Sequence, residues 1–185
     1  ARFQVIRVAP ISGDQDPFWL NGQIPPLDKL EVRQALFHAI DRGAIVDAIY
    51  LGTVGVAGGH TGHAGSNAIY AGNFLGQYNY DPAKAEQLLD AAGYKRDANG
   101  TRFTLKFIGY ATWPAPEIQD AVFGYWEKVG IKVKADLGDE ITPFAKVYEA
   151  SADDPWSGYN VVFQLSMWTI PWIMRGYFHS DRILP

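Results

Sequence analysis

Apolar and polar positions alternate along the chain with two periods, one typical of helices and one typical of strands. Residues 27–52 carry apolar side chains three and four positions apart, which predicts an amphipathic helix followed by a second short helix. Asp28, with Glu31 three positions later, predicts a capping box for the first helix. Asp41 predicts an N-cap for the second, and Gly52 is placed to end that helix in the left-handed conformation.

The segment YDPAKAEQLLDAAGY, residues 80–94, carries both start and stop signals for one helix. Asp81 is the predicted N-cap, Pro82 occupies the first helical position, and Gly93 ends the helix. Residues 53–79 are rich in glycine and small side chains, which favours a long surface loop.

The second half of the chain alternates predicted strands with predicted helices. Residues 102–110 and 131–137 are predicted strands, and a helix that begins at Pro116 lies between them. This order is typical of a βαβ unit, with two parallel strands and a right-handed connection. A helix over 141–150 and a strand over 159–165 continue the alternation. The pattern predicts an α/β fold with a mixed sheet flanked by helices.

The start of the chain differs from the rest. Residues 1–24 predict an entering strand, FQVIRV, and a connecting loop rich in Gly, Pro and Asp, and we assign residues 25–185 to one α/β lobe. Since the chain begins in mid-pattern, we expect it to be a piece of a longer protein.

Composition and charge narrow the classes of function. The formal net charge is −4, from 16 basic and 20 acidic residues, and without a basic stripe we expect no nucleic acid partner. The chain has no cysteine, which removes disulfides, thiol catalysis and thiolate metal sites. The apolar run over 165–178 is shorter than the roughly 20 residues of a spanning helix. It also contains Pro171, so a membrane segment is not predicted.

Candidate binding residues gather after two predicted strands. Open α/β sheets bind ligands just outside the carboxyl ends of their strands. Trp168 and Trp172 lie near that edge, and the further candidates are the aromatic Tyr110 and Trp113 and the charged Arg175. Aromatic faces with few polar groups suit sugar-like or amphipathic solutes, and a guanidinium suits a carboxylate or phosphate. Core packing of the tryptophans and a surface salt bridge of the arginine are the structural alternatives.

Four segments together resemble the family 5 extracellular solute-binding proteins, the dipeptide- and oligopeptide-type receptors of ABC importers. They are PPLDKLEVRQALFHAIDRGAIVDAIYLG, YNYDPAKAEQLLDAAGY, EIQDAVFGYWEKVGIKVKADL and YNVVFQLSMW. The first three cover residues 21 to 137, and the last extends the resemblance nearly to the end of the chain.

The resemblance implies one lobe of a two-lobe receptor. This sequence would be most of the C-terminal lobe, with a periplasmic-binding-protein-like (type II) fold and without the N-terminal lobe of the same receptor. Its partners would be a small-molecule solute and the membrane permease of an ABC importer. The location would be periplasmic or extracellular, membrane-associated through the transporter. The family has no catalytic residues and needs no cofactor, and Arg33 and Asp41 are expected to make structural hydrogen bonds.

One position departs from the peptide-binding members of the family. Those members carry an aspartate three residues after the tryptophan that ends the late strand, and its carboxylate receives the peptide's α-amino group. Trp168 matches the tryptophan, but the third residue after it is Pro171. Because proline cannot bind a cation, we expect a sugar-like or amphipathic solute rather than a free peptide.

Three alternatives remain. His60 and His63 in HTGH are candidate metal ligands, and some relatives of the family handle nickel complexes. The surrounding glycines, and the lack of a nearby acidic third ligand, favour solvated histidines. A hydrolase is not predicted, because the chain contains no G-x-S-x-G motif. A protein-interaction domain that uses an aromatic edge is the third alternative.

Overall fold

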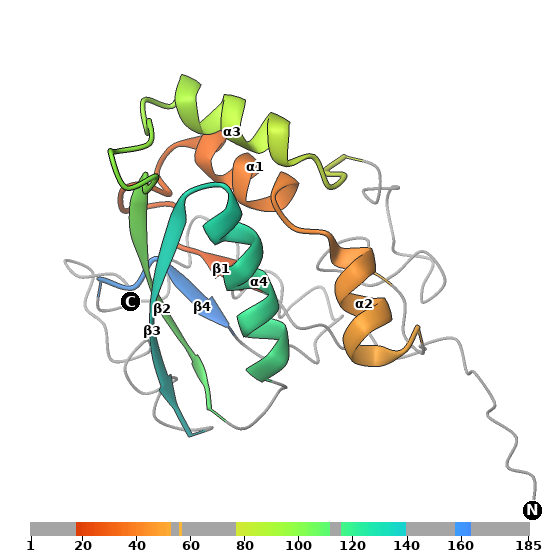
Figure 1. The fold of residues 1–185 in the computed structure, drawn as a ribbon. Helices are drawn as coiled ribbons and strands as arrows, with labels where there is room; N and C mark the ends of the chain where they lie inside the picture. Colours follow the sequence, from red (N-terminus) through yellow and green to blue (C-terminus); the bar gives the residue numbers. More distant parts are fainter. Residues whose placement is uncertain (1–17, 53–55, 57–76, 112–115, 140–157, 164–185) are drawn as a thin grey trace, which may run out of the picture.

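The computed structural model describes residues 18–52, 56, 77–111, 116–139 and 158–163 (Figure 1). Three helices follow the first strand, and helices and strands alternate between residues 82 and 138. In chain order the elements are β1 (Phe18–Leu20), α1 (Leu30–His38), α2 (Arg42–Tyr50), α3 (Pro82–Ala91), β2 (Phe103–Tyr110), α4 (Pro116–Lys128), β3 (Ile131–Gly138) and β4 (Val161–Phe163).

The four strands form one mixed sheet in the order β1-β4-β2-β3. β2 pairs in parallel with β3, from Phe103 opposite Ile131 to Tyr110 opposite Gly138. β2 also pairs in parallel with β4, and β1 pairs antiparallel with β4. The predicted α/β fold with a mixed sheet is therefore confirmed, as is the parallel β2–α4–β3 unit.

One hydrophobic core joins the helices to one face of the sheet. Figure 1 shows α1 and α3 side by side at the end of the sheet where β2 begins, and α4 alongside the sheet. From the sheet, the core contains Leu105 and Phe107 of β2 and Val161 and Phe163 of β4, which share one face because side chains alternate along a strand. Tyr110 at the end of β2 also belongs to the core. The indole N–H of buried Trp126 in α4 donates to the carbonyl of Leu36 in α1 at 3.2 Å, so two helices are joined inside the core.

The helix boundaries follow their predicted caps in two of three cases. The Asp41 carboxylate accepts a hydrogen bond from the Ala44 N–H at 2.9 Å, and the Asp81 carboxylate accepts one from the Lys84 N–H at 2.9 Å. Gly93 has the expected positive φ angle of 89° after α3. The predictions for Asp41, Asp81 and Gly93 are confirmed. Gly52 is left-handed as predicted, with a φ of 63°, but the C-cap of α2 is Leu51, which is already left-handed with a φ of 52°.

The capping box at Asp28 is wrong. The N-cap of α1 is Lys29, and no side chain caps it. Instead, the Asp28 N–H donates to the carbonyl of Ile24, and the Asp28 carbonyl accepts from the Arg33 guanidinium. Asp28 therefore belongs to the turn before the helix, one residue too early to cap it.

The interpretation of the early segment as connecting loop is wrong for Phe18–Leu20, which form β1. These residues pair with β4, a partner far along the chain that local patterns do not reveal. Buried Asn160 supports the pairing, since its carbonyl accepts from the Asn21 N–H and its amide donates to the Pro25 carbonyl. The division of the chain at residue 24 stays a prediction.

Other predicted elements differ in length or fall outside the described residues. The late strand begins at Val161 rather than at residue 159. Here the N–H of Asn160 already donates to the Lys106 carbonyl, and its side-chain oxygen accepts from the Lys106 N–H. The strand over 3–8, the helix over 141–150 and nearly all of the loop over 53–79 lie outside the described residues.

Candidate functional site

The candidate site lies at the carboxyl edge of the parallel strands. β2 ends at Tyr110 and β3 ends at Gly138, and these two residues are directly opposite each other. The next residue of the chain, Ala111, donates its N–H to the Gly138 carbonyl at 2.8 Å. β4 is parallel to β2 and carries Phe163 toward the same edge. The carboxyl ends of neighbouring parallel strands therefore meet, which is the usual position of a ligand in this class of sheet.

Tyr110 is the one predicted ligand-binding residue within the described part of the chain. It is only 4% exposed, and its ring meets the ring of Phe163 edge to face, with centroids 6.3 Å apart. This arrangement is a favourable one for two aromatic rings. This ring contact packs the end of β2 against the end of β4. The role that is observed for Tyr110 is packing, and its contact with a solute stays a prediction.

The other candidate residues lie outside the described residues. They are Trp113, Trp168, Trp172, Arg175, His60 and His63. Their predicted roles in ligand or metal binding stay predictions. In the ranges that the structure describes, no cluster of three or more His, Asp or Glu side chains is arranged to hold a metal ion. In the same ranges, no helix has the length and apolar character needed to cross a bilayer.

Gln119 was not among the predicted residues, although it lies directly beneath this edge. It is 1% exposed, and its amide nitrogen Nε2 donates to the Tyr110 carbonyl at 2.8 Å. Its amide oxygen Oε1 has no hydrogen-bond partner among the described residues. The sequence does carry a signal for this role. Gln119 occupies the buried stripe of α4 with Val122 and Trp126, where an apolar side chain is the ordinary choice.

Gly109 provides the space that the Gln119 side chain occupies. A Cβ atom added at Gly109 would lie 2.2 Å from Oε1 of Gln119 and 2.6 Å from Cε1 of Phe107. Neither distance is compatible with van der Waals contact. Just before the edge, the absence of a side chain at Gly109 leaves room for the Gln119 side chain of α4. The close approach of another group is a typical reason for a glycine inside a strand.

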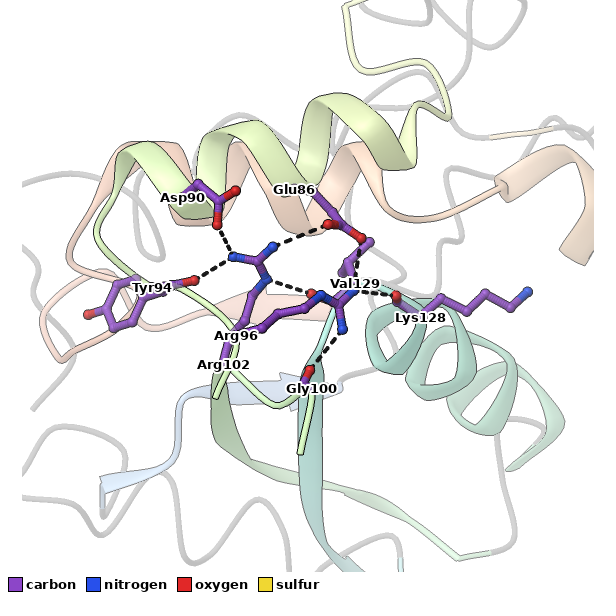
Figure 2. A network of polar contacts seen from close by, with 8 residues as sticks. All are labelled: Glu86, Asp90, Tyr94, Arg96, Gly100, Arg102, Lys128 and Val129. Carbon is purple, nitrogen blue, oxygen red and sulfur yellow. Dashed lines mark hydrogen bonds and ion pairs between the residues drawn. The ribbon is translucent and has the colours of Figure 1, made fainter. Parts of the chain in front are cut away.

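The opposite end of the β2–α4–β3 unit is held by charged side chains (Figure 2). The Arg102 guanidinium, whose side chain is 1% exposed, forms ion pairs with Glu86 and Asp90 of α3. It also donates to the carbonyls of Tyr94 at 2.6 Å and Val129 at 3.0 Å. Each of the three guanidinium nitrogens of Arg102 thus has a partner in α3 or in the chain before β2 and β3.

Arg96 extends this network to the end of α4. Its guanidinium donates to Glu86 at 2.8 Å, and to the carbonyls of Gly100 and Lys128, also at 2.8 Å. Figure 2 shows both guanidinium groups turned toward Glu86. Because these groups are occupied by chain-internal partners at the amino ends of the strands, the network stabilises the fold and is remote from the candidate edge.

Arg33 and Asp41 make the structural hydrogen bonds that were expected. The Arg33 guanidinium donates to the carbonyls of Leu27 at 2.7 Å and Asp28 at 3.1 Å. Asp41 caps α2, as described above.

A separate group of aromatic rings lies where the segment before α3 crosses α1 and α4. Phe37 stacks on Tyr78 with centroids 5.3 Å apart, and Tyr80 meets Tyr125 edge to face at 5.6 Å. Phe37 and Tyr80 are 41% and 43% exposed. Burial, followed by the negative charge of Asp41, raises the pKa of Tyr125 above the ordinary value of a phenol. The sequence analysis did not anticipate this exposed aromatic surface.

Comparison with known proteins gives a family match over nearly the whole chain. The profile of the bacterial extracellular solute-binding proteins, family 5 (middle region), matches residues 5–183.

Two curated relatives match parts of the chain. Heme-binding protein A of Haemophilus influenzae is 35% identical over 114 residues, which are 60% of this chain and 20% of that protein. Di/tripeptide-binding protein 1 of Pseudomonas aeruginosa is 36% identical over 117 residues, 59% of this chain and 20% of that protein. The matched region is thus about a fifth of the length of these relatives.

A solved structure extends the likeness to the fold. The periplasmic binding protein AgaA of A. tumefaciens R10, in complex with agropinic acid, superposes with a TM-score of 0.69 at 25% identity. The likeness covers 94% of this chain and 33% of AgaA. The mixed sheet flanked by helices is therefore a periplasmic-binding-protein fold, as the sequence analysis predicted.

Proposed function

Because the chain belongs to the bacterial extracellular solute-binding proteins of family 5, we propose that it is one lobe of the receptor of an ABC importer. In this role the lobe captures a small solute in a cleft shared with the N-terminal lobe. The loaded receptor then docks on a membrane permease. The setting is periplasmic or extracellular, with membrane association through the transporter, and the role is binding without catalysis.

The observation that carries the proposal is the shared carboxyl edge of β2, β3 and β4. Three parallel strands end or run together there, and the ends of β2 and β3 are joined by the hydrogen bond from Ala111 to Gly138. Such an edge exposes strand ends and loops to solvent while a packed sheet holds them in place. The proposed contacts come from the loops that follow it, with Trp113, Trp168, Trp172 and Arg175 beside Tyr110.

The proposed solute is sugar-like or amphipathic, with an acidic group for Arg175. The reasons are the aromatic character of the candidate residues and Pro171 at the position where peptide-binding members carry an aspartate. The relatives are named for heme and for di- and tripeptides, and AgaA holds agropinic acid. Because these three ligand classes differ chemically, the family alone leaves the solute open.

The experiment that tests this proposal is native mass spectrometry of the full-length receptor purified from its own cells. We expect a bound small solute that dissociates on activation in the gas phase. A receptor that carries a peptide with a free amino terminus would contradict the proposed solute class. A full-length receptor that carries no solute, and binds none from a panel of sugars, opines, peptides and metal complexes, would contradict the proposed function.

A second candidate function is a protein-interaction surface. The exposed rings of Phe37 and Tyr80 favour it, because aromatic side chains are enriched in the cores of protein interfaces. Size-exclusion chromatography with light scattering tests this candidate. Self-association that is lost in a Phe37→Ser, Tyr80→Ser double variant would support it, and a monomer at all concentrations would count against self-association.

A further inference from the structure

We propose that Gln119 is a positioning residue of the binding edge, and this inference rests on the proposed function. Its side-chain amide joins the two ends of the β2–α4 connection and thereby fixes the main chain where it enters the site. Gln119 touches no solute in this account, because it is buried and acts through the Tyr110 carbonyl.

The geometry of the connection is the first argument. β2 ends at Tyr110 and α4 begins at Pro116, so residues 111–115 connect the two elements at the carboxyl edge. Gln119 lies in the first turns of α4, and its Nε2 reaches back over the connection to the Tyr110 carbonyl at 2.8 Å. One buried hydrogen bond therefore fixes the end of β2 relative to the first turns of α4.

The unpaired amide oxygen is the second argument. Burying a polar atom without a partner is unfavourable, so an apolar side chain of the same shape would serve simple packing better. Gln119 nonetheless places Oε1 in the interior without a partner among the described residues. What the glutamine supplies, and an apolar side chain cannot, is the hydrogen bond that its Nε2 donates to Tyr110.

The matching space at Gly109 is the third argument. The nearest heavy atom to a Cβ at this position would be Oε1 of Gln119, at 2.2 Å. β2 therefore has no side chain directly before the edge, and the Gln119 amide occupies the space that a side chain would need. Glycine weakens a strand, since it adds no packing and loses more backbone entropy on folding. The presence of both Gly109 and Gln119 is explained if the fixed position of the end of β2 matters more than the stability that the two residues cost.

These contacts hold consecutive residues of the edge from different sides. Tyr110 is held through its carbonyl by α4 and through its ring by Phe163, and Ala111 is held through its N–H by β3. A strand end that is fixed before the ligand arrives needs no ordering on binding. Binding sites gain affinity from this kind of preorganisation.

The test compares two variants of the full-length receptor. Gln119→Met keeps the length and burial of the side chain and removes the donor to Tyr110. Trp126→Phe is the matched control, because Trp126 is buried in the same helix and its indole donates to a carbonyl of α1, away from the edge. Thermal unfolding measures the loss of stability that each variant suffers.

Hydrogen–deuterium exchange is the first readout. In Gln119→Met we expect amide exchange in a peptide covering residues 109–112 to accelerate at least tenfold relative to a peptide covering 103–107. In Trp126→Phe we expect this ratio to stay within twofold of the parent. An unchanged ratio in Gln119→Met, or an equal rise in the control, would overturn the inference.

Affinity is the second readout, measured by isothermal titration with trialanine and with an oligosaccharide that carries a carboxylate as probes. We expect Gln119→Met to weaken binding of whichever probe the parent binds at least tenfold, and the control to weaken it less than twofold. Equal affinities of Gln119→Met and parent would overturn the inference. If the parent does not bind the oligosaccharide, the proposed solute class loses support, whether or not trialanine binds. If the parent binds neither probe, the exchange ratio alone decides the role of Gln119.

Discussion

At the scale of single residues, Arg102 shows how a buried charge is stabilised in this chain. Its guanidinium pairs with two carboxylates and two carbonyls, and its side chain is almost fully buried while both acids stay partly exposed. Removing one member of such a group leaves its partners unpaired. We predict that Arg102→Met lowers the free energy of unfolding by about 2–4 kcal/mol, since at least two carbonyls lose a charged donor.

The control for Arg102 is Arg96 in the same network. The side chain of Arg96 is 33% exposed, so water can replace its partners when it is removed. We expect Arg96→Met to cost about 1 kcal/mol or less, as is usual for exposed ion pairs. Urea unfolding of both variants decides, and equal losses would contradict the proposed importance of burial.

Two aspartates test the capping assignments. Asp81 accepts a hydrogen bond from the Lys84 N–H and caps α3, whereas Asp28 lies before the N-cap of α1 and caps nothing. We predict that Asp81→Ala lowers the free energy of unfolding by about 1 kcal/mol and that Asp28→Ala changes it by less than about 0.5 kcal/mol. Thermal or urea unfolding measures both. A larger loss at Asp28 than at Asp81 would restore the capping box that the sequence suggested.

At the scale of elements, two glycines should respond to the same substitution in opposite directions. In β2, a Cβ at Gly109 would overlap Gln119 and Phe107, and we predict that Gly109→Ala costs about 1–3 kcal/mol because the core must shift. In α4, a Cβ at Gly124 meets nothing within 4 Å. Gly124→Ala should stabilise the protein by about 0.5–1 kcal/mol, because alanine is the better helix former.

The pair of glycine variants has a simple readout. Urea unfolding should shift the midpoint downward for Gly109→Ala and upward for Gly124→Ala. The same direction of shift in both would mean that the close fit between Gly109 and Gln119 is not what determines the effect.

Elements governed by local chemistry were predictable from the sequence. Asp41 and Asp81 cap their helices and Gly93 ends α3, because these signals act within one turn of the chain. The parallel pairing of β2 and β3 followed from the strand–helix–strand order and was also predictable. The capping box at Asp28 failed because Arg33 and the turn at Ile24 engage its backbone, a competition that spacing alone does not reveal.

Elements that depend on distant partners were not predictable. β1 exists because Phe18–Leu20 meet Val161–Phe163, and no local pattern marks that encounter. Within the candidate site, Tyr110 was identified from its place at a strand end. Gln119 was overlooked, although its place in an apolar stripe indicates a buried hydrogen bond. Its partner, the Tyr110 carbonyl, is visible only in the structure.

At the scale of the whole molecule, the two ends of the β2–α4–β3 unit have different roles. The amino ends of its strands are held by the network around Arg102, and the carboxyl ends form the candidate edge with the Gln119–Tyr110 contact. This separation fits the general rule that stability residues and binding residues occupy opposite ends of parallel strands. Variants at Arg102 should therefore change stability and leave the affinity for solute unchanged in the folded population.

The proposed mechanism also predicts what one lobe does alone. A solute that bridges two lobes favours the closed receptor only by its higher affinity for the closed state. A single lobe would offer the solute only part of these contacts.

The most direct test of this account uses the solute that native mass spectrometry finds on the full-length receptor. Isothermal titration measures the affinity of this solute for the full-length receptor and for the 185-residue chain. The account predicts that the short chain binds that solute at least 100-fold more weakly, a difference of about 2.7 kcal/mol in binding free energy. Equal affinity of the two proteins would contradict capture between two lobes.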